Sequence, residues 1–135
     1  MAVDWSAVTA WFGRVPRFHD CEIVSIDLRR DPEPTIVRLH AFEMSSEIDE
    51  RGYFKLVKHA LVTFQLRGII EQDFAYWNHQ NALNELTIED GERGDRLVFH
   101  GTYGIHGEIE TKSIAITLEP VADTDVEKTL VAGRR

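Results

Sequence analysis

Alternating hydrophobic and polar positions divide much of the chain into short strands. Over residues 22–30 apolar and polar side chains alternate, which is the period-two pattern of a strand with one buried face. Two prolines at 31–34 fix the backbone and donate no hydrogen bond, so they predict a turn. The alternation resumes over 35–42 and predicts a second strand that forms a hairpin with the first.

The same alternation predicts further strands downstream. A turn signal rich in Gly and Asp occurs at 90–95, and a second turn with two glycines occurs at 103–107; turns of this kind separate neighbouring strands of a hairpin. Pro120 ends the last apolar run. We therefore expect strands at 59–66, 85–89, 97–103 and 109–118, the last as one long strand or two short ones.

The segment 69–83 is compatible with two structures. Phe74, Trp77 and Asn81 would share one side of a helix, whereas Phe74 and Tyr76 also suit a strand that ends at Trp77. Asn side chains bond to nearby backbone and compete with helix. This favours the strand followed by a tight loop at 78–81, preceded by a bend at Arg67 and Gly68.

Three further segments complete the predicted outline. Residues 4–12 place apolar side chains at helical spacing behind Asp4 as the cap, and Gly13 ends the helix. The polar, acidic segment 43–52 is expected to be an exposed loop, and 121–135 a weakly patterned C-terminal tail. Together these predict one globular domain over 1–120 of the α+β class, predominantly antiparallel β. It would be a single sheet or sandwich of about six to eight strands with a short N-terminal helix.

Composition narrows the possible partners. The 135 residues include 23 acidic side chains against 15 Lys and Arg, for a formal charge of −8. Because nucleic-acid binding depends on neutralising phosphates with Lys and Arg, a nucleic-acid partner is not expected. The charge serves either solubility alone or the attraction of a basic protein.

Nothing in the sequence predicts a secreted or membrane protein. The chain turns acidic directly after Met1, without a basic and then apolar leader, and its apolar runs are short. The single cysteine, Cys21, has no partner for an internal disulfide. We expect a reducing cytoplasm and no membrane contact.

The densest group of ionisable residues is His19, Asp20 and Glu22 at the entrance of the first strand. With His40 on the neighbouring strand and His106 in a glycine-flanked turn, it has the residue types of a metal site or an acid–base catalyst. No fixed metal-ligand spacing accompanies these residues. A structural polar cluster is the favoured interpretation, in which Asp20 bonds backbone amides, and no metal or other cofactor is expected.

Other catalytic motifs are missing from the sequence. No serine lies in a Gly-x-Ser-x-Gly elbow, and the acids on both sides of Cys21 would raise its pKa, so its thiol is expected to be inert. The glycines at 101, 104 and 107 are explained by turns. Asn78 and Asn81, beside Trp77, form either a satisfied loop network, which is favoured, or a small recognition patch.

Several stretches together resemble a known family. The run Phe-His-Asp-Cys-Glu-Ile-Val-Ser-Ile-Asp-Leu-Arg-Arg at 18–30 follows Trp-Phe-Gly at 11–13. Downstream come Thr-Phe-Gln-Leu-Arg-Gly at 63–68 and Asn-His-Gln-Asn-Ala-Leu at 78–83. Over roughly 10–120 the chain is similar to the immunity protein 50 family. That resemblance implies a small cytoplasmic protein that neutralises a polymorphic bacterial toxin by binding it, without catalysis.

If the resemblance holds, a basic toxin would meet the acidic loops of this chain. The expected contact residues, placed on a shared face, are Glu43, Glu47, Asp49, Glu50, Glu71, Asp73, Trp77, Asp90 and Glu92. Opposite charge would speed the encounter, and aromatic anchors would slow dissociation. Two other classes of function remain open: a metal-dependent enzyme built on His19, Asp20 and His106, and a small domain that forms a homodimer through a strand edge.

Overall fold

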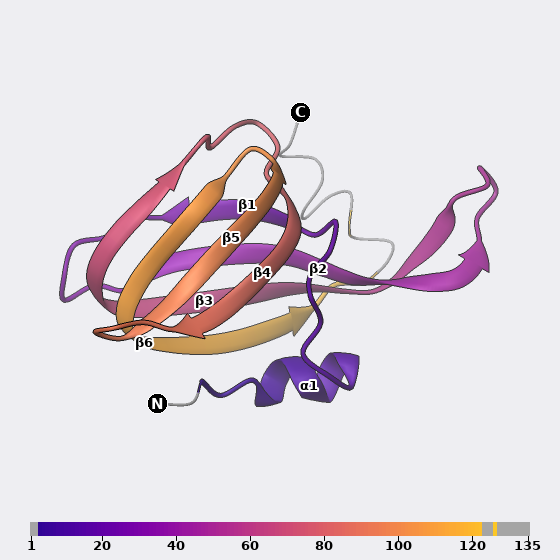
Figure 1. Cartoon of the computed structure of the whole chain (residues 1–135). Helices are drawn as coiled ribbons and strands as arrows, with labels where there is room; N and C mark the ends of the chain where they lie inside the picture. Colours follow the sequence, from indigo (N-terminus) through magenta and orange to yellow (C-terminus); the bar gives the residue numbers. More distant parts are fainter. Residues whose placement is uncertain (1–2, 123–125, 127–135) are drawn as a thin grey trace.

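Six antiparallel strands close into a barrel, and one short helix packs against it (Figure 1). The computed structural model describes residues 3–122 and 126. Around the barrel the strand order is β1-β2-β3-β6-β5-β4. The elements are α1 (Ser6–Phe12), β1 (Glu22–Asp27), β2 (Thr35–Ile48), β3 (Phe54–Ala75), β4 (Ala82–Asp90), β5 (Asp95–Tyr103) and β6 (His106–Pro120). The prediction of a mostly antiparallel β protein with an N-terminal helix is confirmed, and the single sheet is closed on itself.

Most neighbouring strands are joined by the predicted turns. The turn at 31–34 joins β1 to β2, and the Gly- and Asp-rich turn after Asp90 joins β4 to β5, with Gly91 N–H bonded to Gly94 O at 2.7 Å. Gly104 between β5 and β6 has φ +83°, and a Cβ there would lie 2.4 Å from the carbonyl oxygen of Gln80. Only glycine fits this turn.

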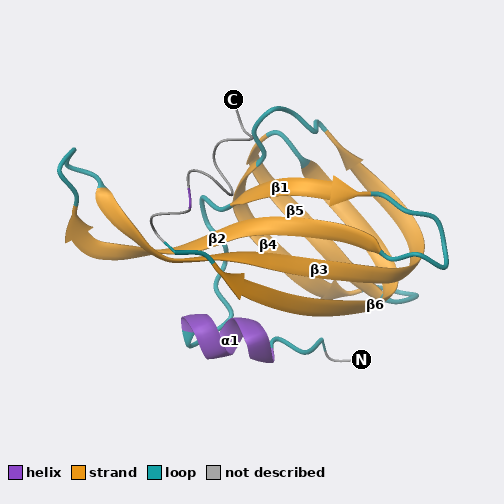
Figure 2. Ribbon diagram, turned by 180° about the vertical axis from the view of Figure 1, so that it is seen from behind, coloured by secondary structure: helices purple, strands orange, loops and turns teal. Residues whose placement is uncertain are grey.

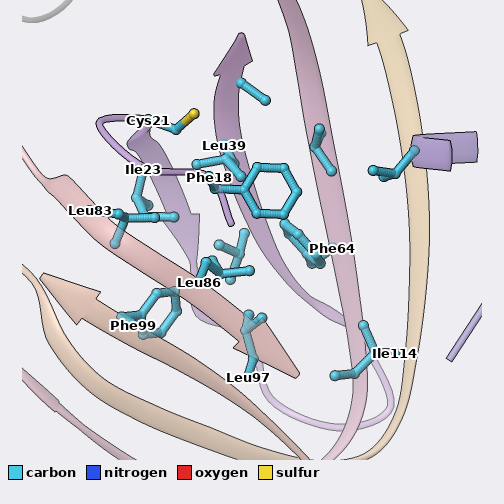
Figure 3. Close-up of a cluster of buried hydrophobic side chains, with 14 of the residues drawn as sticks. Phe18, Cys21, Ile23, Leu39, Phe64, Leu83, Leu86, Leu97, Phe99 and Ile114 are labelled. Atoms are coloured by element: carbon cyan, nitrogen blue, oxygen red, sulfur yellow. The ribbon is translucent and has the colours of Figure 1, made fainter. Parts of the chain in front are cut away.

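The interior of the barrel is filled by large apolar side chains from every strand (Figure 3). Leu39, Phe64, Leu83, Phe99 and Ile109 are fully buried. Each such side chain contributes about 1.5–3 kcal/mol on leaving water. The strands predicted from alternation therefore owe their stability to this common core.

Helix α1 adds to the core from outside the sheet. Val8 and Phe12 are buried against it, and Trp5 stacks on Phe18 at a ring distance of 6.3 Å. Gly13 ends the helix with φ +81°, as predicted. Asp4 lies one residue before the N-cap position, where its carboxylate accepts a 2.9 Å hydrogen bond from Ser6 N–H. Hydrogen bonding to Ser6 lowers the pKa of Asp4.

The prediction that 43–52 is an exposed loop is wrong for most of that segment. β2 continues to Ile48 and pairs with the start of β3 as far as Ile48 opposite Phe54. The register shifts between Ala41 and Glu43 and again between Met44 and Ile48. These irregularities break the period-two pattern that a strand otherwise shows. We call residues 43–58 the arm, which extends away from the barrel (Figures 1 and 2).

Other boundaries also differ from the predictions. β1 ends at Asp27, before Arg30. β3 runs through the expected bend at Gly68, where φ is +70° and a register shift follows between Ile69 and Glu71. The bend is therefore a bulge within one strand.

For 69–83 the favoured interpretation is confirmed, because β3 continues to Ala75 and a loop follows. β6 is one long strand. The tail predicted at 121–135 lies mostly outside the described residues. No helix in the described part of the chain is both long and apolar enough to cross a membrane.

Candidate partner-binding surface

The structure divides the predicted acidic contact residues between two regions. Glu43, Glu47, Asp49 and Glu50 belong to the arm or its turn. Glu71 and Asp73 lie on the second half of β3, and Asp90 and Glu92 at the β4–β5 turn beside it. The acidic residues that we expected on one shared face therefore form two groups, on different parts of the fold.

The second region is a wall of carboxylates on the outside of the barrel. Asp73 lies directly opposite Glu108, and Glu71 directly opposite Glu110, on the paired strands β3 and β6. Ile109, between the two β6 acids, is fully buried in the core, so both acids lie on the outer side of the sheet, where Glu108 is partly exposed and Glu110 is largely covered. The four carboxylate residues, which we call the acidic wall, line a hollow of about 230 Å³.

Two arginines from β5 and the preceding turn offset part of this charge. Arg93 Nη2 lies 2.9 Å from Glu71 Oε2 and 3.1 Å from Glu110 Oε1. Arg96 bonds Glu108 at 3.3 Å. No ion pair involves Asp73 within the part of the chain that the structure describes. Two arginines therefore face four carboxylates, and the wall remains negative.

The contacts around Arg93 shift two pKa values. The Arg93 backbone N–H donates to Glu110 Oε2 at 3.0 Å, and this bond, with help from the guanidinium, lowers the pKa of Glu110. The hydrogen bond to Glu71 raises the pKa of Arg93. Both groups are therefore held in their charged forms near neutral pH.

Exposed aromatic side chains border the acidic wall. Tyr76 and Trp77 follow the end of β3, a few residues beyond Asp73, and Tyr103 ends β5. His79 packs edge-on against Tyr103 with ring centres 5.6 Å apart. We call Tyr76, Trp77 and Tyr103 the aromatic rim. Tyr76 and Trp77 thus follow the wall along the chain, and His79 connects their loop to Tyr103.

The amides next to this rim hold the loop together. Asn81 is buried, and its Oδ1 accepts hydrogen bonds from the N–H groups of Asn78 and Ile105, both at 3.0 Å. Its Nδ2 donates to the carbonyl of Asn78 at 2.9 Å. The Asn81 side chain therefore stabilises the loop through hydrogen bonds within the protein.

The ionisable residues at the start of β1 and His106 have different hydrogen-bond partners. His19 Nδ1 lies 3.1 Å from the carbonyl oxygen of Asn84, and Glu22 Oε1 accepts a 2.6 Å bond from Gln80 Nε2. His106 Nδ1 accepts from the Gly101 N–H at 3.3 Å. Over residues 3–122 and 126, no three His, Cys, Asp or Glu side chains are grouped so as to hold a metal ion.

Comparison with known proteins identifies the family. A model described as immunity protein 50 matches residues 5–120. The chain belongs to this family. No curated protein and no solved structure matches it. The resemblance over roughly 10–120 is therefore confirmed and extends slightly further toward the N-terminus.

Two structural features of this immunity protein 50 member were not predicted from the sequence. Glu108 and Glu110 lie on a predicted strand, but only the register of β3 with β6 shows that they oppose Asp73 and Glu71. A buried pair, His40 Nε2 and His59 Nδ1 at 2.9 Å, lies where the arm leaves the barrel. No sequence spacing links these two histidines.

Proposed function

We propose that this immunity protein neutralises a basic bacterial toxin by binding it one-to-one through the acidic wall and the aromatic rim. The observation that carries the proposal is the placement of Asp73, which makes no ion pair among the described residues, directly opposite Glu108. Like charges directly opposite on paired strands are destabilising. A cationic surface from another protein would relieve that repulsion.

The two parts of the surface would act at different stages of binding. A negative wall on a chain of charge −8 attracts a basic protein over a long range and speeds the encounter. The exposed rings of Tyr76, Trp77 and Tyr103 are of the residue types that dominate binding energy once water is expelled. Together they would give fast association and slow dissociation.

Inhibition of this kind is stoichiometric and involves no turnover. The bound protein would block the toxin surface or its access to substrate, and each toxin molecule would require one immunity protein. We place this binding in the bacterial cytoplasm, where the reduced Cys21 is stable.

The direct test uses the C-terminal domain encoded by the gene immediately upstream of this one. We expect it to copurify one-to-one with the immunity protein, and the association rate to fall as salt rises. The double variant Asp73→Lys with Glu108→Lys should slow association about tenfold or more at low salt. The matched control Glu33→Lys reverses a charge in the β1–β2 turn and should change the rate little.

Two outcomes would overturn the proposal. One is the absence of any binding between the immunity protein and that domain. The other is an association rate that does not depend on salt and is equal in the double variant and the control.

A further inference from the structure

Tyr76, the residue directly after β3, has a left-handed backbone conformation with φ +67°. This conformation is sterically unfavourable for any residue with a Cβ atom, and for a bulky side chain it is an outlier. Glycine occupies the positions 13, 52, 68 and 104, where φ lies between +70° and +86°. The fold alone would therefore be served better by glycine at position 76.

Three other non-glycine residues share this conformation, and each has a place in the fold. Phe18 is buried in the core. The backbone N–H of Asp20 donates to a β4 carbonyl at 2.9 Å, and the carbonyl of Lys58 accepts a hydrogen bond from helix α1. Tyr76, in contrast, is 76% exposed, and its ring makes no hydrogen bond or aromatic contact within the described part of the chain. Packing therefore does not explain an aromatic residue here.

The segments on both sides of Tyr76 impose its backbone conformation. β3 stays paired with β6 up to Ala75. Two residues beyond Tyr76, the backbone N–H and carbonyl of Asn78 are both bonded to the side chain of Asn81. The reversal of the chain at this end of the barrel (Figure 1) therefore falls on residues 76 and 77. Strained residues persist where the surrounding structure imposes them, and they are concentrated at functional sites.

The surface next to Tyr76 combines aromatic rings with negative charge. Trp77 is 47% exposed, and Asp73, three residues before Tyr76, makes no ion pair among the described residues. The segment 68–92 contains six acidic side chains and no Lys or Arg. Aromatic faces and carboxylates both attract cations. The charge of this segment is therefore complementary to a basic group.

We propose that Tyr76 anchors a basic side chain of the toxin, which packs on the rings of Tyr76 and Trp77 and pairs with the carboxylate of Asp73. Arginine fits better than lysine, because its planar guanidinium stacks on an aromatic ring and also bonds a carboxylate. The left-handed conformation destabilises the free protein, but it fixes the backbone that carries the exposed ring before binding. Less conformational freedom is then lost on binding. The inference rests on the function proposed above and names one contact within that surface.

A second copy of this chain is a poorer partner for Tyr76 than a basic protein is. Each copy carries a charge of −8. Two copies that met through the segment 68–92 would bring together acidic side chains without any Lys or Arg between them. Like-charge contacts of this kind oppose association. Charge therefore favours the toxin over a homodimer.

Three substitutions at position 76 separate the backbone strain from the ring. Tyr76→Gly removes both, Tyr76→Ala keeps the strain without the ring, and Tyr76→Phe keeps both. We expect the midpoint of thermal unfolding of Tyr76→Gly to lie about 2–5 °C above that of Tyr76→Ala. Tyr53 is the matched control, because it is 70% exposed and lacks a positive φ. Tyr53→Gly should be no more stable than Tyr53→Ala.

Binding to the upstream-encoded domain tests the ring itself. We expect Tyr76→Gly and Tyr76→Ala to weaken affinity about tenfold or more, chiefly through faster dissociation. Tyr76→Phe and Tyr53→Ala should retain the affinity of the wild type. Tyr76→Gly would thus be more stable than Tyr76→Ala and equally defective in binding.

A double-mutant cycle tests whether Tyr76 and Asp73 contact the same basic side chain. Tyr76→Ala and Asp73→Asn are measured singly and together. If one cation contacts both residues, the loss of affinity in the double variant should be clearly smaller than the product of the two single losses. Single losses that simply multiply would contradict a shared side chain and overturn the inference.

Failure of this inference is distinguishable from failure of the proposed function. If the domain does not bind the wild-type chain, the proposed function fails and the inference fails with it. If the domain binds, but Tyr76→Ala binds like the wild type or Tyr76→Gly is no more stable than Tyr76→Ala, only the inference fails. A wild-type dimer in light scattering that Tyr76→Ala dissociates would assign the ring to a second copy and would also overturn it.

Discussion

The indole nitrogen of Trp11 donates a hydrogen bond to the backbone carbonyl of Lys58, 2.9 Å away. Lys58 has φ +54° and lies in the register shift where the arm leaves the barrel. The side chain of Glu43 on the facing strand bonds both Arg14, at 3.0 Å, and Lys58, at 3.7 Å. The end of helix α1 therefore fixes the base of the arm.

Replacing Trp11 by Phe should loosen the arm while keeping most of the apolar contact. Loss of one hydrogen bond is expected to lower the free energy of unfolding by about 1 kcal/mol, measured by urea denaturation. Amides at 43–48 and 54–58 should exchange faster than in the wild type. Trp5→Phe is the matched control, since Trp5 packs on Phe18 and Phe64 and not on the arm. Equal exchange in the two variants would contradict the role given to Trp11.

Removing one charge from the acidic wall should stabilise the free protein. Asp73→Asn relieves the repulsion with Glu108 and leaves the ion pairs of Arg93 and Arg96 intact. We expect the free energy of unfolding to rise by a few tenths of a kcal/mol to about 1 kcal/mol. The effect should shrink at high salt. Glu119→Gln, a surface acid opposite Leu61, should change little, and a destabilised Asp73→Asn variant would refute the repulsion.

Cys21 should be unreactive in the folded protein. Burial is the main cause that raises the pKa of this thiol to about 12, and the thiolate is the reactive form. At pH 8 a disulfide reagent such as Ellman's reagent should label Cys21 only as fast as the chain opens or unfolds. Addition of urea should speed labelling in step with unfolding. Rapid labelling of the native protein would show that the β1 entrance opens locally.

Glu110 should contribute to stability at neutral pH and lose that contribution in acid. The backbone N–H of Arg93 lowers the pKa of Glu110 below its ordinary value of 4.5. Because the folded pKa is the lower one, the stabilisation is complete above about pH 4.5 and disappears as the pH falls through the folded pKa. Urea denaturation at several pH values should show a shallower loss of stability in acid for Glu110→Gln than for wild type. Parallel curves for the two proteins would exclude this role.

Strand positions were predictable wherever the core imposes strict alternation. The segments around Leu39, Phe64, Phe99 and Ile116 alternate cleanly, and all four lie in strands. The arm was missed because two register shifts disrupt alternation between Ala41 and Ile48. Alternation of apolar and polar residues identifies a regular strand, but it does not show where a β-bulge interrupts the pairing.

Closure of the barrel was not predictable from side-chain pattern. β1 and β4 meet at Glu22 opposite Ala82, with backbone bonds from Ile23 N–H to Asn81 O and from Leu83 N–H to Cys21 O. Backbone groups make these bonds, and any residue other than proline supplies them. The sequence therefore could not distinguish a single sheet from a sandwich.

The residue types of the proposed contact surface could be predicted from the sequence, but only some of the residues that form it could be. Glu71, Asp73 and Trp77 were selected for their charge or aromatic character, and the structure places them on the second half of β3 and in the loop that follows it. Their neighbours Glu108 and Glu110 were not selected, because the bulge after Ile69 decides which β6 residues they oppose.

The arm is the part of the sheet least involved in closing the barrel. Beyond residue 43 it shares no strand pairing with β1 or β6, so substitutions or changes of length at its tip leave the ladder of the barrel undisturbed. The barrel can therefore fold and close without any contribution from the tip of the hairpin, whose sequence and length are constrained mainly by its own two strands.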